Sequence, residues 1–132
     1  MEFFDTHCHL DVAEFDADRA AVLLAARQVG VQHLLIPAIQ RTSWPALLAL
    51  CANDQQLYPA LGLHPVMLDQ HQANDVAALA NQLAKKRPVA IGEIGLDYAI
   101  QDLDRQQQQV LFEDQLALAA DSQLPVILHV RK

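Results

Sequence analysis

Two histidines separated by a single residue, His7 and His9, stand near the start of the chain. On an extended segment, residues i and i+2 project from the same face, so both imidazoles can reach one ion. Neutral imidazole is a common ligand for zinc, iron, manganese and similar ions. The pair therefore predicts part of a divalent-metal site. The alternative is two unrelated surface or capping histidines.

A carboxylate and a third histidine stand at the ends of two later apolar runs. Glu93 follows the run 89–92, and His129 follows the run 125–128. Burying a carboxylate is unfavourable by several kcal/mol unless it is paired or binds a cation. We therefore predict that both residues join the histidine pair at one metal centre, with Glu93 as the catalytic carboxylate. The alternatives are a solvated loop glutamate and a structural histidine.

Four more polar residues follow predicted strands and could serve the same site. His64 lies in a Gly-Leu-His-Pro turn, where it could contact substrate or hold the turn. Arg131 could bind a phosphate or carboxylate in bidentate fashion, with a surface ion pair as the alternative. Asp5 and Asp97 are predicted to orient the imidazoles or to complete the metal environment.

Other reactive or charged residues are interpreted as structural. His33 begins a strand at the end away from the site, and His71 lies in a site-side loop without supporting neighbours. Cys8 is expected to pack against a helix. The basic run 85–87 ends a helix, where cations are favoured, and lies on the face away from the site. It is therefore not interpreted as a DNA clamp.

The elements that must position these residues are short apolar runs alternating with segments of helical periodicity. The apolar runs predict strands over residues 3–5, 33–37, 58–61, 89–92 and 126–129. Helical spacing marks 22–29, 44–51, 76–83 and, less regularly, 112–119. Asp16 is predicted to cap the first helix and Gly30 to end it, and Asp104 with Gln107 resembles a capping box.

Repeated strand-then-helix units imply an α/β protein with parallel strands and right-handed crossovers. Active sites of such folds lie at the carboxyl ends of the strands, where all the candidate site residues fall. Five strands fit either an open doubly wound sheet or part of a (β/α)8 barrel. Only the identities of the site residues can distinguish these two architectures.

The composition fits an ordinary globular protein, with 132 residues, 52% hydrophobic and 19% charged. The start lacks secretory-signal features and no apolar run is long enough to span a membrane, which predicts a cytoplasmic protein without a membrane partner. Two cysteines outside any C-x-x-C pair are expected to be free thiols. The net charge of −7 disfavours nucleic-acid binding unless bound cations compensate.

As a set, four motifs resemble the successive signatures of the TatD family of metal-dependent hydrolases, in its YjjV-like branch. The motifs are Asp5-Thr6-His7-Cys8-His9, Gly62-Leu63-His64-Pro65, Gly92-Glu93-Ile94-Gly95-Leu96-Asp97 and His129-Val130-Arg131. The resemblance covers the whole chain in order. It implies the N-terminal portion of an amidohydrolase-type TIM barrel: an incomplete (β/α)8 barrel with the first five strands and four helices, forming a single partial domain over residues 1–132.

The resemblance also implies roles for the site residues. His7 and His9 would hold one divalent ion, Glu93 would bridge two, and His129 would hold the second; the ions could be Zn, Mn, Mg, Fe or Co. His64 and Arg131 would line the substrate side. The family draws a further histidine from the sixth strand and an aspartate from the eighth, and neither strand is present in these 132 residues.

The function implied is a phosphodiesterase or deoxyribonuclease of TatD type that uses a two-metal-activated water on DNA or another phosphodiester. One alternative is a metal-dependent ester or amide hydrolase of the amidohydrolase superfamily. Another is a catalytically incomplete fragment that acts only by assembly. In that case the open barrel edges would pair with a second chain or with another copy of the same one.

Overall fold

The strands follow one another through the sheet in the same order as along the chain. The computed structural model describes residues 1–132, with five parallel strands in the order β1-β2-β3-β4-β5. They are β1 (Phe3–Asp5), β2 (Val31–Pro37), β3 (Leu57–Leu61), β4 (Ala90–Asp97) and β5 (Val126–Arg131). A doubly wound sheet reverses its strand order at a switch point, and this sheet does not. The architecture is therefore a half-barrel, as predicted.

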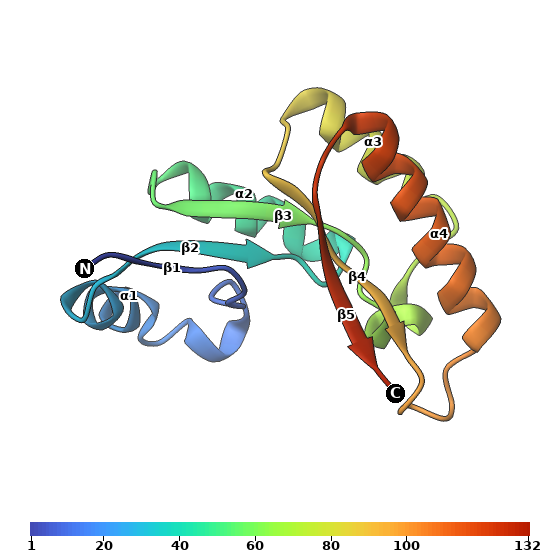
Figure 1. The fold of residues 1–132 in the computed structure, drawn as a ribbon, viewed down its shortest axis with the longest axis horizontal. Helices are drawn as coiled ribbons and strands as arrows, with labels where there is room; N and C mark the ends of the chain where they lie inside the picture. The colour runs from blue at the N-terminus through green and yellow to red at the C-terminus, as the bar shows by residue number, and fades with distance from the viewer.

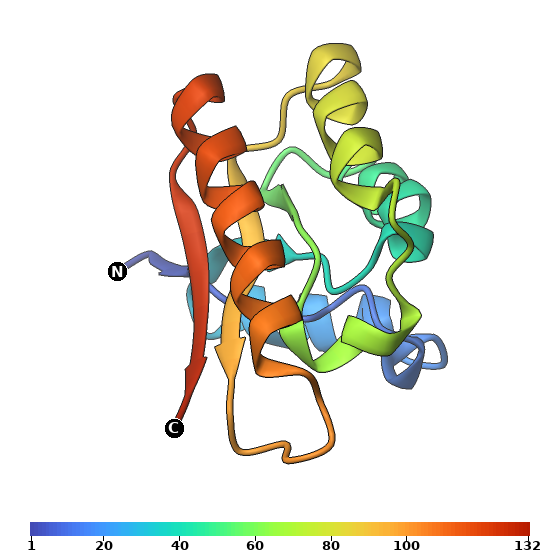
Figure 2. The ribbon, with the colours of Figure 1, turned by 90° about the vertical axis from the view of Figure 1, so that its right-hand side faces the viewer.

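Helices connect the strands and lie along the outside of the curved sheet. They are α1 (Arg19–Gln28), α2 (Trp44–Ala52), α3 (Asp75–Lys85) and α4 (Arg105–Ser122), with short 3-10 helices η1 (Ala13–Phe15), η2 (Arg41–Ser43) and η3 (Pro65–Gln70). Figure 1 shows β1, β2 and β3 running across the view while β4 and β5 run down it. Figure 2 shows α2, α3 and α4 on one side of the strands. No helix combines the length and apolar character needed to cross a membrane.

The hydrophobic core fills the space between the sheet and these helices. Ile36 of β2 and Ile91 of β4 are fully buried, as are Leu47 of α2 and Leu79 of α3. Full burial of such a side chain stabilises the fold by about 1.5–3 kcal/mol. This packing fixes the strands whose carboxyl ends carry the candidate site.

The two outer strands leave large apolar side chains uncovered. Phe3 and Phe4 of β1 are 50% and 48% exposed, and Leu128 and Val130 of β5 are 50% and 78% exposed. Both strands are edges of the sheet, where backbone groups lack a neighbouring strand. The uncovered apolar surface therefore coincides with the open edges of the half-barrel.

Three predicted strand limits were wrong by two residues or more, and two others by one residue. β2 begins at Val31, two residues before its predicted start, and β5 continues to Arg131. The larger error concerns β4, because pairing with β5 continues to Asp97 and places Glu93 inside the strand. Glycine weakens most strand patterns, so a sequence rule ends the strand at Gly92.

The predicted helix limits agree with the structure in part. Asp16 does not cap α1: Asp18 holds that position, while Asp16 accepts a 2.7 Å hydrogen bond from Arg19. Gly30 follows α1 with a positive φ of 97°, as the prediction requires. Asp104 caps α4 by accepting the N–H of the predicted partner residue at 2.9 Å.

Two buried glutamines on α4 hold the segments that leave β3 and β4. Gln115 accepts the Leu63 N–H at 2.8 Å and donates to the Leu63 carbonyl at 3.1 Å. Gln108 makes the same pair of bonds with the Asp97 backbone, at 2.8 and 3.0 Å. Both glutamines have no exposed surface. They explain the irregular apolar spacing of this helix, because two of its core-facing positions are polar.

Replacing Gln115 with Leu is expected to lower the free energy of unfolding by about 2–5 kcal/mol. The change leaves a buried N–H and a buried carbonyl without hydrogen-bond partners, and each such group destabilises the fold by about 1–3 kcal/mol. Urea unfolding measures the difference. The matched control is Gln109→Leu, since Gln109 is exposed and bonds the exposed Glu113. Equal unfolding energies for the two variants would contradict the bracing role.

Cys51 of α2 is expected to react slowly with thiol reagents in the folded protein. Burial raises its pKa from 9.0 to about 12, so the reactive thiolate is scarce near neutral pH. The folded state favours the protonated thiol, so its stabilising contribution is present below pH 9 and is lost as pH rises toward 12. Labelling at about pH 8 with and without denaturant, mapped by mass spectrometry, measures the protection. Equal labelling rates with and without denaturant would contradict the expected protection of Cys51.

Candidate metal centre

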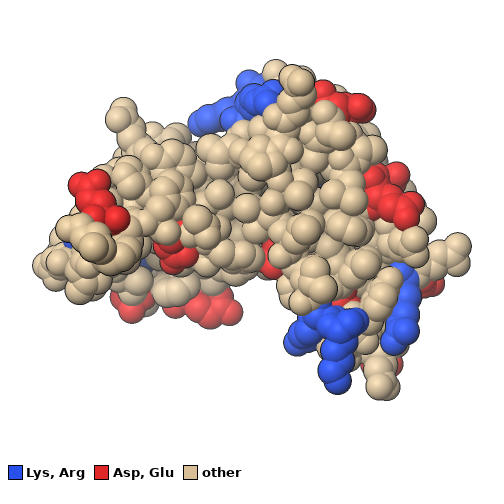
Figure 3. All heavy atoms as spheres, viewed as in Figure 1, with Lys and Arg blue, Asp and Glu red and all other residues tan.

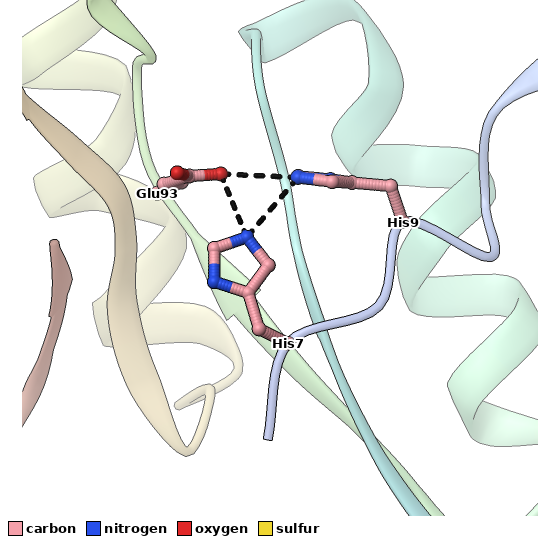
Figure 4. Close-up of side chains that lie close together, drawn as sticks. All are labelled: His7, His9 and Glu93. Atoms are coloured by element: carbon pink, nitrogen blue, oxygen red, sulfur yellow. Dashed lines mark hydrogen bonds and ion pairs between the residues drawn. The ribbon is translucent and has the colours of Figure 1, made fainter. Parts of the chain in front are cut away.

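Three ligand-type atoms converge where the loop after β1 meets β4. His7 Nε2 lies 2.9 Å and His9 Nε2 lies 3.0 Å from Glu93 Oε2. The two imidazole nitrogens are 3.2 Å apart. Figure 4 shows both rings pointing at the same carboxylate oxygen. The structure thus brings together three of the four predicted metal ligands from segments that are far apart in the sequence.

The chemistry of these three atoms fits a divalent cation. Bonds of about 2.0–2.1 Å to a tetrahedral metal place ligand atoms about 3.3 Å from one another, close to the separations found here. His9 Nδ1 lies 3.0 Å from the Pro37 carbonyl oxygen, which only an N–H can satisfy. In the neutral ring its Nε2 therefore carries a lone pair toward Glu93, the tautomer that a metal-binding histidine requires.

The second oxygen of Glu93 faces a different pair of histidines. Oε1 lies 3.1 Å from His129 Nδ1 and 3.5 Å from His64 Nε2. The rings of these two histidines lie 4.3 Å apart, centre to centre. The Glu93 carboxylate, which is 4% exposed, therefore stands between two groups of imidazole nitrogens. This is the arrangement in which a carboxylate can bridge two ions.

The His129 side chain lies against the carboxylate of Asp97. His129 Nε2 lies 2.9 Å from Asp97 Oδ2, and Arg131 Nε donates to Asp97 Oδ1 at 3.0 Å. With its Nε2 hydrogen directed at Asp97, the His129 ring presents the Nδ1 lone pair to Glu93. Asp97 is fully buried, so this pairing is shielded from water.

His64 is set up as a hydrogen-bond donor. Its Nδ1 accepts the Val66 N–H at 3.0 Å, so in the neutral ring the hydrogen sits on Nε2. A nitrogen that carries hydrogen cannot ligate a metal, although it can donate to Glu93 or to a bound anion. This geometry favours the predicted substrate contact over a place among the ligands.

The other residues considered in the sequence make contacts outside the group of imidazoles around Glu93. Asp5 accepts the backbone N–H of His7 at 3.0 Å, so it holds the loop and contacts no imidazole. His33 lies 3.2 Å from the Tyr58 hydroxyl, away from the site, in the structural role expected of it. His71 has a neighbour that the sequence did not indicate, since its Nε2 lies 2.8 Å from the His64 carbonyl. Cys8 packs against the core.

Asp11 lies close to the metal centre and the sequence analysis missed it. One of its oxygens is buried without a hydrogen-bond partner, and burial raises its pKa. It stands two residues after His9, and the i+2 spacing that linked His7 with His9 could have found it.

Comparison with known proteins places the chain in a family. Residues 4–132 match the family described as TatD related DNase. The chain belongs to this family. The match confirms the relationship that the four sequence motifs predicted.

Several curated relatives are similar to this TatD-family chain over almost its whole length. It is 45% identical to the metal-dependent hydrolase YjjV of Escherichia coli K12, covering 98% of the chain and 51% of YjjV. It is 32% identical to the metal-dependent hydrolase YabD of Bacillus subtilis, covering 97% and 50%. It is 37% identical to the 3'-5' ssDNA/RNA exonuclease TatD of Pantoea ananatis, covering 98% and 50%. The chain thus spans about half the length of these relatives.

Solved structures agree with the barrel assignment. The crystal structure of Escherichia coli YjjV superposes with a TM-score of 0.94 at 44% identity, covering 98% of the TatD-family chain and 51% of YjjV. A TatD-family hydrolase from Entamoeba histolytica gives 0.87 at 24% identity, covering 100% and 50%, and supports the fold alone. The half-barrel therefore corresponds to about half of each matched chain.

The electrostatics of the site favour ionised carboxylates. Burial raises the pKa of Glu93, but hydrogen bonds from His64 and His9 outweigh burial and hold the pKa well below its usual value. The same hydrogen bond raises the pKa of His9. Burial also opposes ionisation of Asp97, yet its bonds lower its pKa overall. Concentrated negative charge inside a ring of imidazoles is suited to binding a cation.

Cationic side chains are distributed unevenly over this TatD-family chain. Figure 3 shows Lys and Arg gathered beside the carboxyl ends of β4 and β5 and, separately, at the opposite end of the molecule. Arg131 belongs to the first group, with a side chain that is 54% exposed. Arg87 belongs to the second, where its side chain donates to the Gln123 carbonyl at 3.0 Å. Positive charge is thus available beside the candidate metal centre.

Proposed function

We propose that the TatD-family chain carries much of the active site of a metal-dependent hydrolase that cleaves phosphodiester bonds in nucleic acid. One observation carries the proposal: each oxygen of the buried Glu93 carboxylate faces its own group of imidazole nitrogens. Relatives named as metal-dependent hydrolases, and one named as a single-strand exonuclease, support the class of reaction.

In this proposal two divalent ions share Glu93. His7 and His9 would hold the first ion with Glu93 Oε2, and His129 would hold the second with Oε1. When bound, such ions lower the pKa of a water molecule and stabilise negative charge on phosphoryl oxygens. The Pro37 carbonyl and Asp97 would keep the imidazoles in the required tautomers.

The residues around the ligands are placed to bind and orient an anionic substrate. Arg131 contacts Asp97 through Nε alone, so its two terminal nitrogens are free to bind a phosphate. His64 Nε2 carries a hydrogen that can be donated to a phosphoryl oxygen. Together with the ions, these donors offset the net charge of −7, which would otherwise repel a polynucleotide.

The proposal includes completion of the barrel by further strands. Residues 1–132 would form one partial barrel domain, and the family resemblance places another histidine and an aspartate on later strands. The uncovered Phe4 of β1 and Val130 of β5 mark where those strands would pair. They could come from a continuation of the chain, from another chain, or from a second copy. A cytoplasmic location remains a prediction.

Hydrolysis of a 5′-labelled single strand by the native protein tests the function. With manganese or magnesium we expect stepwise shortening that a chelator abolishes, and no turnover of small carboxylic esters or amides. Metal-dependent cleavage of those esters or amides without cleavage of the strand would favour the alternative amidohydrolase chemistry. No metal-dependent turnover of any substrate by the native protein would overturn the proposal.

A further inference from the structure

An aromatic ring with a cation over it stands at the carboxyl end of β4, directly after the buried Asp97. Tyr98 is the first residue after β4, and its N–H donates to the Arg131 carbonyl at 2.9 Å. The Arg105 guanidinium lies over the ring, 4.9 Å from its centre. Tyr98 is half-buried, Arg105 is exposed, and neither side chain forms a hydrogen bond within the protein.

This pair is connected to the metal centre by short links. Tyr98 follows Asp97, which holds both His129 and Arg131 at about hydrogen-bond distance. Its backbone bond to Arg131 joins its main chain to that of the residue proposed to bind phosphate. The backbone of Tyr98 is therefore fixed at the carboxyl ends of β4 and β5, beside the segment that carries Arg131.

Three cationic side chains are available to a polyanion at this end of the acidic chain. Arg105, Arg131 and Lys132 are three of the nine Lys and Arg residues, and all lie at this end of β4 and β5. Asp102 and Asp104 are in the same loop, and Asp104 is engaged in capping α4. An exposed cation over a half-buried ring contributes little to folding, so stability alone gives weak reason for this pairing.

We propose that Tyr98 and Arg105 form a binding subsite for one nucleobase of a single-stranded polynucleotide whose adjacent phosphate lies at Arg131. Aromatic rings and guanidinium groups both stack on the flat face of any base, without sequence preference. In a duplex both faces of a base are already stacked, so the subsite selects single strands. The inference rests on the proposed function, because it names the substrate of the same site.

Binding in the presence of a chelator tests the subsite without cleavage. Fluorescence anisotropy of the native protein compares a labelled oligothymidylate with an abasic strand of equal length and charge. We expect about tenfold tighter binding of the base-bearing strand, the size of one stacking contact. Tyr98→Leu is expected to remove the preference and Tyr98→Phe to keep it. Equal binding of both strands by the unmodified protein would overturn the inference.

Charge variants separate stacking from general attraction. Arg105→Gln is expected to weaken binding of both strands and reduce the preference for bases. The matched control Lys85→Gln, which removes an equally exposed cation at the far end of α3, should change neither. If Tyr98→Leu is folded by circular dichroism and keeps the full preference, the subsite assignment is wrong.

Hydrolysis measured separately distinguishes failure of the inference from failure of the proposed function. With manganese added, cleavage of both strands at equal rates, unaffected by Tyr98→Leu, would overturn the base subsite and leave the phosphodiesterase proposal standing. Preferential binding of the base-bearing strand without any metal-dependent cleavage would support the base subsite and overturn the phosphodiesterase proposal. Faster cleavage of the base-bearing strand, lost in Tyr98→Leu, supports both.

Discussion

Replacing Glu93 with Gln is expected to lower divalent-metal affinity and metal-dependent hydrolysis by more than about a hundredfold. Losing a residue that only orients a ligand already lowers affinity or activity by about 10–100-fold, and Glu93 contacts both imidazole groups directly. The amide keeps the shape of the side chain but removes its charge and one of its two acceptor oxygens. Calorimetric titration with zinc or manganese measures the affinity.

The matched control for this change is Glu113→Gln, the same substitution on an exposed face of α4. Glu113 contacts only Gln109, at 2.9 Å, so metal affinity and hydrolysis should stay at the level of the unmodified protein. A Glu93→Gln protein that binds metal as tightly as this control would show that the carboxylate is not a ligand.

Replacing Gly95 with Ala is expected to destabilise the protein by about 2–6 kcal/mol. Gly95 has a φ of +144°, a conformation that costs a non-glycine residue about 1–3 kcal/mol. An added Cβ would also overlap the carbonyl oxygen of His129 on the paired strand. Forcing an atom into such a contact costs about another 1–3 kcal/mol. Urea unfolding measures the loss, and it should be accompanied by weaker metal binding because His129 must shift.

Gly30→Ala provides the comparison for this position. Gly30 also has a positive φ, of 97°, but its nearest contact is the carbonyl of the exposed Met1, at 2.8 Å. That carbonyl lies outside any strand and can move, so the expected destabilisation is about 1 kcal/mol. If Gly95→Ala costs no more than Gly30→Ala, the close approach of β4 and β5 does not constrain the site as described.

Much of the candidate site could be predicted because parallel strands bring their carboxyl ends to one place. His7, Glu93 and His129 each stand at or near the end of an apolar run, so their convergence follows once the runs are taken as neighbouring strands. The i+2 spacing placed His7 and His9 on one face. The choice of a barrel over a doubly wound sheet came from the motif resemblance, because apolar runs do not encode strand order.

Other features depend on contacts between distant segments that local patterns do not contain. Glu93 lies inside β4 because the pairing of β4 with β5 continues past Gly92 and Gly95, and a local rule treats both glycines as breakers. Helical periodicity interprets polar residues as solvent-facing, so the buried Gln108 and Gln115 were not foreseen. The Tyr98–Arg105 contact spans a loop whose conformation no spacing rule specifies.

The most direct test of the central claim is X-ray diffraction from crystals of the native protein grown with manganese or zinc, with data collected at the absorption edge of that metal. We expect an anomalous peak bonded to His7 Nε2, His9 Nε2 and Glu93 Oε2, and a second peak beside Glu93 Oε1 and His129 Nδ1. With metal at saturating concentration, an absence of peaks at Glu93, or peaks bound elsewhere in the molecule, would contradict it.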